Sequence, residues 1–236
     1  MARAADGGSV PRMCATPDGG PHAGRSSGAR VTALAPRPYA HAVNLQPRDL
    51  PGTTVTEQEH EVAPQATTPT QACAGLGNLA RPIAKVDSAK FVGISGSQHD
   101  EIRSNVEVMP TTVLATQKNA AEVSSRAISC AERLLLPKLD AANGSRVHFG
   151  HATITRLPDP LPGVTGAVEI RIATPILGVP TAIEPEQPTF YIDAFAFLSG
   201  PAEVSMAATA FPKPVPAASE TRLLALLHSR ASAVKL

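Results

Sequence analysis

Apolar and polar residues alternate most regularly in residues 168–172, where three aliphatic side chains are separated by Glu169 and Arg171. An alternation of period two places one set of side chains on the buried face of a β-strand and the other on its exposed face. Similar patterns bounded by turn residues predict further strands at 53–62, 89–95, 102–109, 146–157, 189–198 and 202–211. The last two are joined by Ser199-Gly200-Pro201, which is typical of a tight hairpin.

Helical periodicity occupies two longer segments. In residues 116–142 apolar side chains recur at intervals of three and four, and Pro137 is expected to kink this helix. Residues 218–234 form a second amphipathic helix, and shorter helical turns are predicted in 41–50 and 70–76. Because the strands follow one another instead of alternating with helices, the order predicts an α+β fold. We expect an antiparallel sheet of about six strands, with the two main helices packed on one face.

The chain divides into two parts by composition. Residues 1–38 hold six Gly, five Pro and five Arg with almost no periodic apolar pattern. Such a segment buries too little surface to offset the entropy of ordering it, so we predict a disordered tail. Residues 39–236 are expected to fold as a single globular domain. The first residues contain no apolar central region of the kind that defines a secretory signal.

Composition excludes several function classes. Of the 236 residues, 21 Lys and Arg nearly balance 20 Asp and Glu, and only 3% are aromatic, with no Trp. A dedicated nucleic-acid binder needs a basic surface or stacking aromatic side chains, so we expect no nucleic-acid partner. No stretch approaches the roughly 20 consecutive apolar residues of a membrane helix.

Motifs for chemistry are weak. His148 and His151 are three residues apart on a predicted strand, so they point to opposite faces and are not expected to share a metal ion. No glycine-rich phosphate-binding motif occurs, and we expect no cofactor. Asp193 and Glu203 would be neighbours across the predicted hairpin, but charged residues on the solvent face of a sheet are much commoner than catalytic pairs. We therefore assign no catalytic residue.

Three cysteines are present, at positions 14, 73 and 130. Cys14 lies in the predicted tail, whereas Cys73 and Cys130 lie in segments expected to be helical and ordered. From spacing alone, a bridge between Cys73 and Cys130 and two separate buried thiols are both open. No Cys/His spacing fits a zinc site.

The C-terminal part resembles a known type of domain. The motifs that carry this resemblance are Tyr191-Ile-Asp193, Phe197-Leu-Ser-Gly-Pro-Ala-Glu-Val204, Pro212 and Glu220-Thr-Arg-Leu-Leu-Ala-Leu-Leu227. They are similar to the closing strand–strand–helix of bacterial extracytoplasmic domains in small lipoproteins and in the sensor regions of membrane Ser/Thr kinases. The resemblance implies a domain outside the cytoplasm, a bridge between Cys73 and Cys130, and a ligand cleft between sheet and helices. The chain differs from this type in lacking a second cysteine pair, an export signal and a kinase domain.

These observations predict an exported, non-enzymatic domain that binds or senses a small or lipidic ligand, with peripheral association with the cell envelope. The predicted cleft lies beneath the loop at 178–188, and its lining is Phe190, Phe195, Phe197 and Phe211. The alternative for these four side chains is ordinary core packing. Two other functions remain as alternatives, a structural or interaction module of the envelope and a hydrolase whose Ser, His and Asp come from distant segments.

Overall fold

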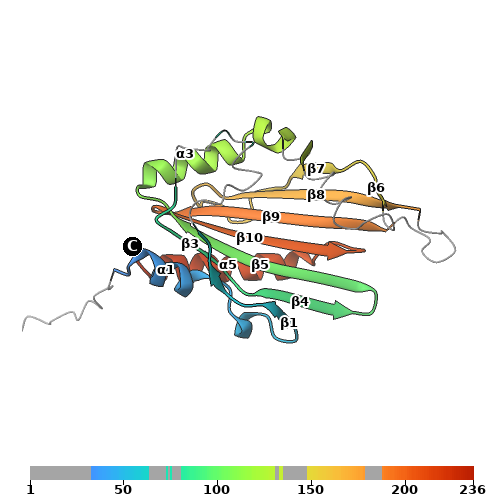
Figure 1. Cartoon of the computed structure of the whole chain (residues 1–236), viewed down its shortest axis with the longest axis horizontal. Coiled ribbons are helices and arrows are strands. Elements are labelled where there is room, and N and C mark those ends of the chain that lie inside the picture. The colour runs from blue at the N-terminus through green and yellow to red at the C-terminus, as the bar shows by residue number, and fades with distance from the viewer. Residues whose placement is uncertain are drawn as a thin grey trace, which may run out of the picture. The chain divides into compact units, whose positions relative to one another are not determined.

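The computed structural model describes residues 33–63, 73, 75, 81–130, 133–134, 148–178 and 188–236. In this part of the chain one antiparallel sheet of ten strands is combined with helices, which confirms the predicted α+β class (Figure 1). The strands are β1 (Thr54–Glu57), β2 (His60–Glu61), β3 (Ala84–Asp87), β4 (Lys90–Ser95), β5 (Gln98–Val108), β6 (His148–Phe149), β7 (Thr153–Arg156), β8 (Val168–Leu177), β9 (Thr189–Ser199) and β10 (Ala202–Phe211). Their main order is β1-β4-β5-β10-β9-β8-β6, with β3 also pairing β5 and β7 also pairing β8.

The sheet has more strands than the six or so predicted. Two segments expected to be continuous, 53–62 and 146–157, are each divided into two short strands. β3 was missed because it is only four residues long and alternates Lys85 and Asp87 with short apolar side chains. The long strands β5, β9 and β10 agree with prediction, and β9 and β10 meet in the expected hairpin, where Gly200 adopts a positive φ of 58°.

The helices cover both faces of the sheet, which corrects the expectation of two helices on one face. The described helices are α1 (Pro36–Val43), the 3-10 turn η1 (Pro47–Asp49), α3 (Thr112–Glu122) and α5 (Ala217–Ala233). α1 and α5 share a core with one face of the sheet. α3 lies against the opposite face, because the side chain of its Lys118 meets Glu107 and Glu203, which alternate with the core residues of β5 and β10.

The kinked helix predicted at 116–142 ends much earlier than Pro137. α3 stops at Glu122, and a second helical stretch begins after Ser124, whose hydroxyl accepts a hydrogen bond from the Ala127 amide. Serine at this position caps the following helical turn and competes with continuation of the preceding helix. Pro137 lies outside the described residues. The predicted terminal helix is confirmed as α5, within one residue at each end.

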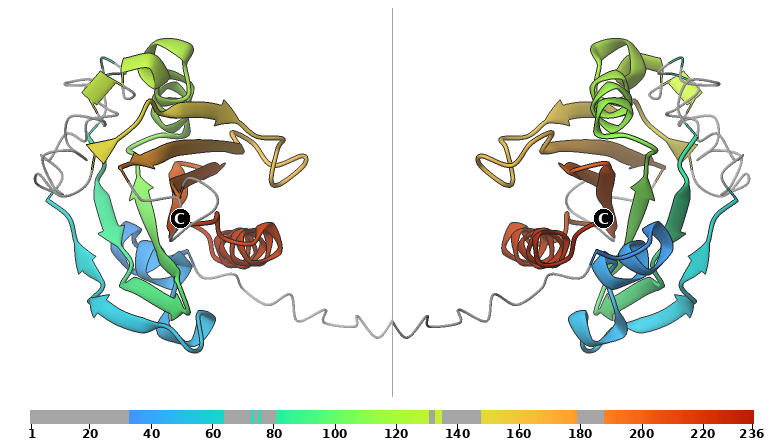
Figure 2. Two further views of the ribbon diagram at one scale, coloured as in Figure 1. Left: turned by 90° about the vertical axis from the view of Figure 1, so that its right-hand side faces the viewer. Right: turned by 90° about the vertical axis from the view of Figure 1, so that its left-hand side faces the viewer.

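The hydrophobic core lies between the sheet and α5, with α1 beside it (Figure 2). Strands β3, β4, β5, β9 and β10 contribute side chains at alternating positions, such as Phe197 on β9 and Val204 on β10, and α5 contributes Leu223 and Leu227. These side chains are at most 1% exposed. The opposite face of the central strands does not belong to this core and can carry a binding site.

Some predictions concern parts of the chain that are not described. Residues 1–32, most of the short helix predicted at 70–76 and the loop residues 179–187 lie outside the described residues. The predicted boundary at residue 39 falls inside α1, which begins at Pro36, a favourable first helical residue. The disordered tail remains a prediction.

Candidate functional site

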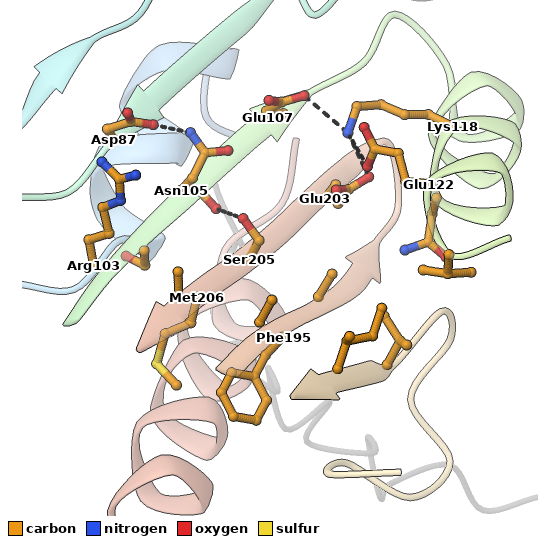
Figure 3. A pocket seen from close by; sticks show the side chains of 18 of the residues that line it. Asp87, Arg103, Asn105, Glu107, Lys118, Glu122, Phe195, Glu203, Ser205 and Met206 are labelled. Carbon is orange, nitrogen blue, oxygen red and sulfur yellow. Dashed lines mark hydrogen bonds and ion pairs between the residues drawn. The ribbon is translucent and has the colours of Figure 1, made fainter. Parts of the chain in front are cut away.

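A pocket of about 340 Å³ lies on the sheet face opposite α5 (Figure 3). Strands β3, β5, β8, β9 and β10 form its floor, and α3 forms one wall. Pockets that bind small molecules have volumes of about 300–1,000 Å³. The volume of this pocket is at the lower end of that range.

The strand register arranges the floor of the pocket in cross-strand rows. Directly paired residues of antiparallel strands point to the same face of a sheet. Two rows run from β5 across β10 and β9 to β8. The first is Arg103, Ala207, Ala194 and Ile170, and the second is Asn105, Ser205, Ala196 and Val168. Each row passes from a polar side chain through two small ones to a branched aliphatic one. The floor is therefore polar at β5 and apolar at β8. Between them, at β10 and β9, the small side chains make the floor low and leave space for a ligand.

A buried cluster of charges closes the pocket beneath α3. The Lys118 ammonium lies 2.9 Å from a Glu122 oxygen, 3.0 Å from a Glu203 oxygen and 3.2 Å from a Glu107 oxygen. Lys85 also donates to Glu107. The side chain of Lys118 is only 2% exposed. Its three ammonium hydrogens match its three carboxylate neighbours, so α3 is held to the sheet by ion pairs (Figure 3).

Burial and charge shift the pKa values in this cluster. Burial raises the pKa of Glu203 to about 8, and Glu122 and Glu107 add to the rise against the opposing charge of Lys118. For Glu107, burial is outweighed by the charges of Lys118 and Lys85, which lower its pKa. For Lys118, burial is outweighed by the surrounding carboxylates, which raise its pKa. The cluster therefore brings two ammonium groups together with three carboxyl groups, of which Glu203 is the one whose pKa is raised.

Local sequence explains how α3 reaches this position. Thr111 caps the helix, because its hydroxyl accepts a hydrogen bond of 3.2 Å from the Leu114 amide. Asn119, one residue after Lys118, donates to the carbonyl of Gly166 over 3.4 Å. A Cβ at Gly166 would lie 2.9 Å from Leu198 and 3.0 Å from Asn119. Glycine at this position lets the loop before β8 approach both α3 and β9.

Sequence reasoning missed this site. The alternation of β5 separates Asn105 and Glu107 from the core residues of this strand, and alternation alone indicates a solvent-exposed face for them. Glu107 is only 4% exposed because Lys118 covers it. The sequence offers one signal for the site, because Lys118 and Glu122 are four residues apart in the predicted helix and can form an ion pair on one of its faces. Nothing local indicates that the partners of this pair come from β5 and β10.

Asp193 and Glu203 are not neighbours, contrary to the hairpin hypothesis. Asp193 pairs in register with Ala208 and Glu203 with Leu198, so the two carboxyl groups project from opposite faces of the sheet. Asp193 instead accepts two hydrogen bonds, of 2.6 and 2.9 Å, from the guanidinium of Arg171.

Asp193 also has an acidic neighbour, Glu220, at the beginning of α5. Glu220 is 3% exposed, and its Oε1 atom has no hydrogen-bond partner. Burial raises the pKa of Glu220 to about 8, and the nearby carboxylates of Asp193 and Glu169 add to the rise. Burial and Asp193 also raise the pKa of Glu169. This cluster lies on the core side of the sheet, away from the pocket.

Among the described residues, the four phenylalanines of the predicted cleft do not lie on one face of the sheet. Phe195 and Phe197 point into the core, where they are 3% and 1% exposed, and Phe197 lies edge-on to His228 of α5. Phe190 and Phe211 occupy alternate positions of their strands, project from the opposite face and are half-buried. Phe190 packs edge-on against Phe149. The cleft prediction ignored the period of two, which separates Phe190 from Phe195 and Phe197.

Cys73 and Cys130 form a disulfide bond, as the resemblance implied. Their Cα atoms lie 5.4 Å apart although 57 residues separate them in the sequence. The bond connects the segment before β3 to the helical residues that follow α3. It is therefore a covalent constraint on the part of the chain that carries α3.

The described residues contain no group of three His, Cys, Asp or Glu side chains arranged to hold a metal ion. Within the same ranges, no helix has both the length and the apolar character that a membrane span requires.

Comparison with known proteins gives matches among solved structures. No family model matches the sequence, and no curated protein matches it either. Among solved structures, the extracellular domain of PknH from Mycobacterium tuberculosis is similar, with a TM-score of 0.42 and 9% sequence identity. The alignment covers 86% of this chain and 99% of that domain. A similarity of this size does not establish a shared function, and the kinship with lipoproteins and kinase sensors stays a prediction.

Proposed function

We propose that this chain is a non-enzymatic domain that binds a small organic or lipidic ligand outside the cytoplasm, as a sensor domain would. The observation that carries the proposal is the pocket of about 340 Å³, whose floor combines small, aliphatic and charged side chains. Specific ligand sites typically combine an apolar lining with a few polar groups that orient the ligand. Ala194, Ala196 and Ala207 keep the middle of the floor low enough to admit such a molecule.

The polar groups of the pocket support binding rather than catalysis. Lys118 is surrounded by three carboxylates, and Lys85 is paired with Glu107, so both ammonium groups are already occupied. A catalytic lysine acts as a base or nucleophile only when its pKa is lowered, whereas here the pKa of Lys118 is raised.

The extracytoplasmic setting rests on the disulfide. Disulfide bonds form and persist in oxidising compartments, whereas cytoplasmic thiols are kept reduced. The Cys73–Cys130 bond links two segments 57 residues apart and supports export to such a compartment. Alkylation of the native protein with a thiol reagent, followed by mass measurement, is expected to leave this pair unmodified.

Binding is tested with N-phenyl-1-naphthylamine, a neutral apolar dye whose fluorescence rises when it leaves water. The wild-type protein is expected to bind the dye with saturable fluorescence. Ala194→Leu and Ala207→Leu raise the pocket floor and are expected to weaken binding at least tenfold. Ala225→Leu is the matched control, because it makes the same substitution at an exposed position of α5. Equal binding by all four proteins, each checked for an intact thermal transition, would refute the pocket as the binding site.

A further inference from the structure

Arg103 is the basic residue of the pocket that is left unpaired. It lies on β5 in the pocket lining, its side chain is exposed, and among the described residues it makes no hydrogen bond or ion pair. The other two basic residues of the lining, Lys85 and Lys118, are held by the carboxylates beneath α3. Asp87, an acidic side chain of the same lining, accepts a hydrogen bond from Asn105 and lies 3.9 Å from His60.

The charges around the pocket therefore favour an anion at Arg103. At the α3 end, the two ammonium groups are paired with three carboxyl groups, so that end offers no unpaired cation to an anionic ligand. A guanidinium group presents a planar set of donors that binds a carboxylate or a phosphate through two parallel hydrogen bonds. Arg103 has this capacity unused, and its side chain forms part of the pocket lining on β5.

The apolar part of the pocket begins directly beside Arg103. Its cross-strand row continues through Ala207 and Ala194 to Ile170 on β8. With neighbouring strands about 4.8 Å apart, the three steps of this row span about 14 Å. The neighbouring row adds Ala196 and Val168 alongside. An anionic head at Arg103 would thus be followed by an apolar body lying across β10 and β9 toward β8.

We infer that the ligand of this pocket is an acidic amphiphile, with a carboxylate or phosphate head bound by Arg103 and an apolar chain lying on Ala207, Ala194 and Ile170. This inference rests on the proposed function and adds the chemical class of the ligand. It assigns Arg103 as the residue that selects the head group. Lys118 and its carboxylates shape the wall of the pocket and do not select the charge.

The test is displacement of N-phenyl-1-naphthylamine by four ligands with the same ten-carbon chain, each used below its micelle concentration. Decanoate and decyl phosphate carry an anionic head, decanol is neutral and decyltrimethylammonium is cationic. Wild-type protein is expected to bind the better anion at least tenfold more tightly than decanol and decyltrimethylammonium, since a charge-assisted contact typically contributes about one order of magnitude in affinity. The ranking of decanoate against decyl phosphate then identifies the head group.

Arg103→Gln is expected to abolish this preference while leaving decanol binding within twofold. Arg48→Gln, at an exposed arginine of η1, is the matched control and is expected to change nothing. The inference is overturned if decanol or the cation displaces the dye as well as the anions do, or if Arg103→Gln keeps the preference. In either case the proposed function stands, provided that Ala194→Leu still weakens dye binding at least tenfold. If wild-type protein does not bind the dye, both proposals fail.

Discussion

Replacing Lys118 by methionine tests the buried cluster that holds α3 over the pocket. Methionine keeps most of the length and the apolar stem of lysine but removes the ammonium group. Glu107, Glu122 and Glu203 then face one another without the cation that lies within 3.2 Å of each of them. Because the Lys118 side chain is only 2% exposed, water cannot easily replace it.

The expected loss of stability follows from that burial. Removing one partner of a buried ion pair typically costs about 3–5 kcal/mol, because the remaining charge is left uncompensated. Glu203, whose pKa is already raised to about 8, takes up a proton and relieves part of the repulsion. We therefore expect the low end, about 3 kcal/mol at pH 7. Without Lys118 the pKa of Glu203 rises further above its unfolded value, so the loss shrinks at pH 5 and grows toward pH 8.

The assay is urea unfolding followed by circular dichroism at pH 5, 7 and 8. Lys90→Met is the matched control, because Lys90 pairs with Glu101 at 3.3 Å but both side chains are more than a quarter exposed. Surface pairs of this kind contribute at most about 1 kcal/mol. The double variant Lys118→Met with Glu203→Met is expected to recover at least about 1 kcal/mol, since it removes one of the uncompensated carboxyl groups. A loss for Lys118→Met equal to that of Lys90→Met and independent of pH would refute the cluster.

Three further measurements test other parts of the structure. Glu220 has a folded-state pKa of about 8, above its ordinary value of 4.5, so its contribution to stability is lost as the pH rises from 4.5 to 8, by up to about 1.4 kcal/mol per pH unit. Glu220→Gln is expected to reduce this loss of stability with pH. Unfolding curves of the variant that keep the wild-type pH dependence would contradict the prediction. Reduction of the Cys73–Cys130 bond is expected to lower the free energy of unfolding by about 4 kcal/mol on the loop-entropy account, and unchanged urea midpoints with and without dithiothreitol would argue against it. Phe197→Ala, in the core, is expected to cost about 3–5 kcal/mol, and Phe190→Ala, on the half-buried face, clearly less; similar losses would show that the faces are wrongly assigned.

The sequence predicted the framework of the fold well where local patterns were long. The alternation on β9 and β10 and the apolar stripe of α5 extend over ten or more residues, so their type and position were predicted closely. β3 was missed because four residues are too few to show a period. The extent of α3 was overestimated because apolar spacing continues past Ser124, where the hydroxyl cap begins a new helical stretch.

The candidate site was much less predictable. The small residues Ala194, Ala196, Ser205 and Ala207 form one surface only after the register pairs β9 with β10. Likewise, Lys118 meets Glu203 over 85 residues of sequence, and no local rule relates them. The four phenylalanines of the predicted cleft are large and apolar, and side chains of this kind most often fill the core.

The most direct test of the account is methyl nuclear magnetic resonance of the protein labelled at alanine, titrated with decanoate. Alanines alternate between the two faces of the same strands, so the methyl groups report which face the ligand occupies. We expect Ala194, Ala196 and Ala207 to shift in a saturable manner, while Ala208 and Ala210, which are 1% exposed in the core, stay in place. Shifts at Ala208 and Ala210 with Ala194 and Ala207 unchanged would place the ligand on the α5 side and contradict the account.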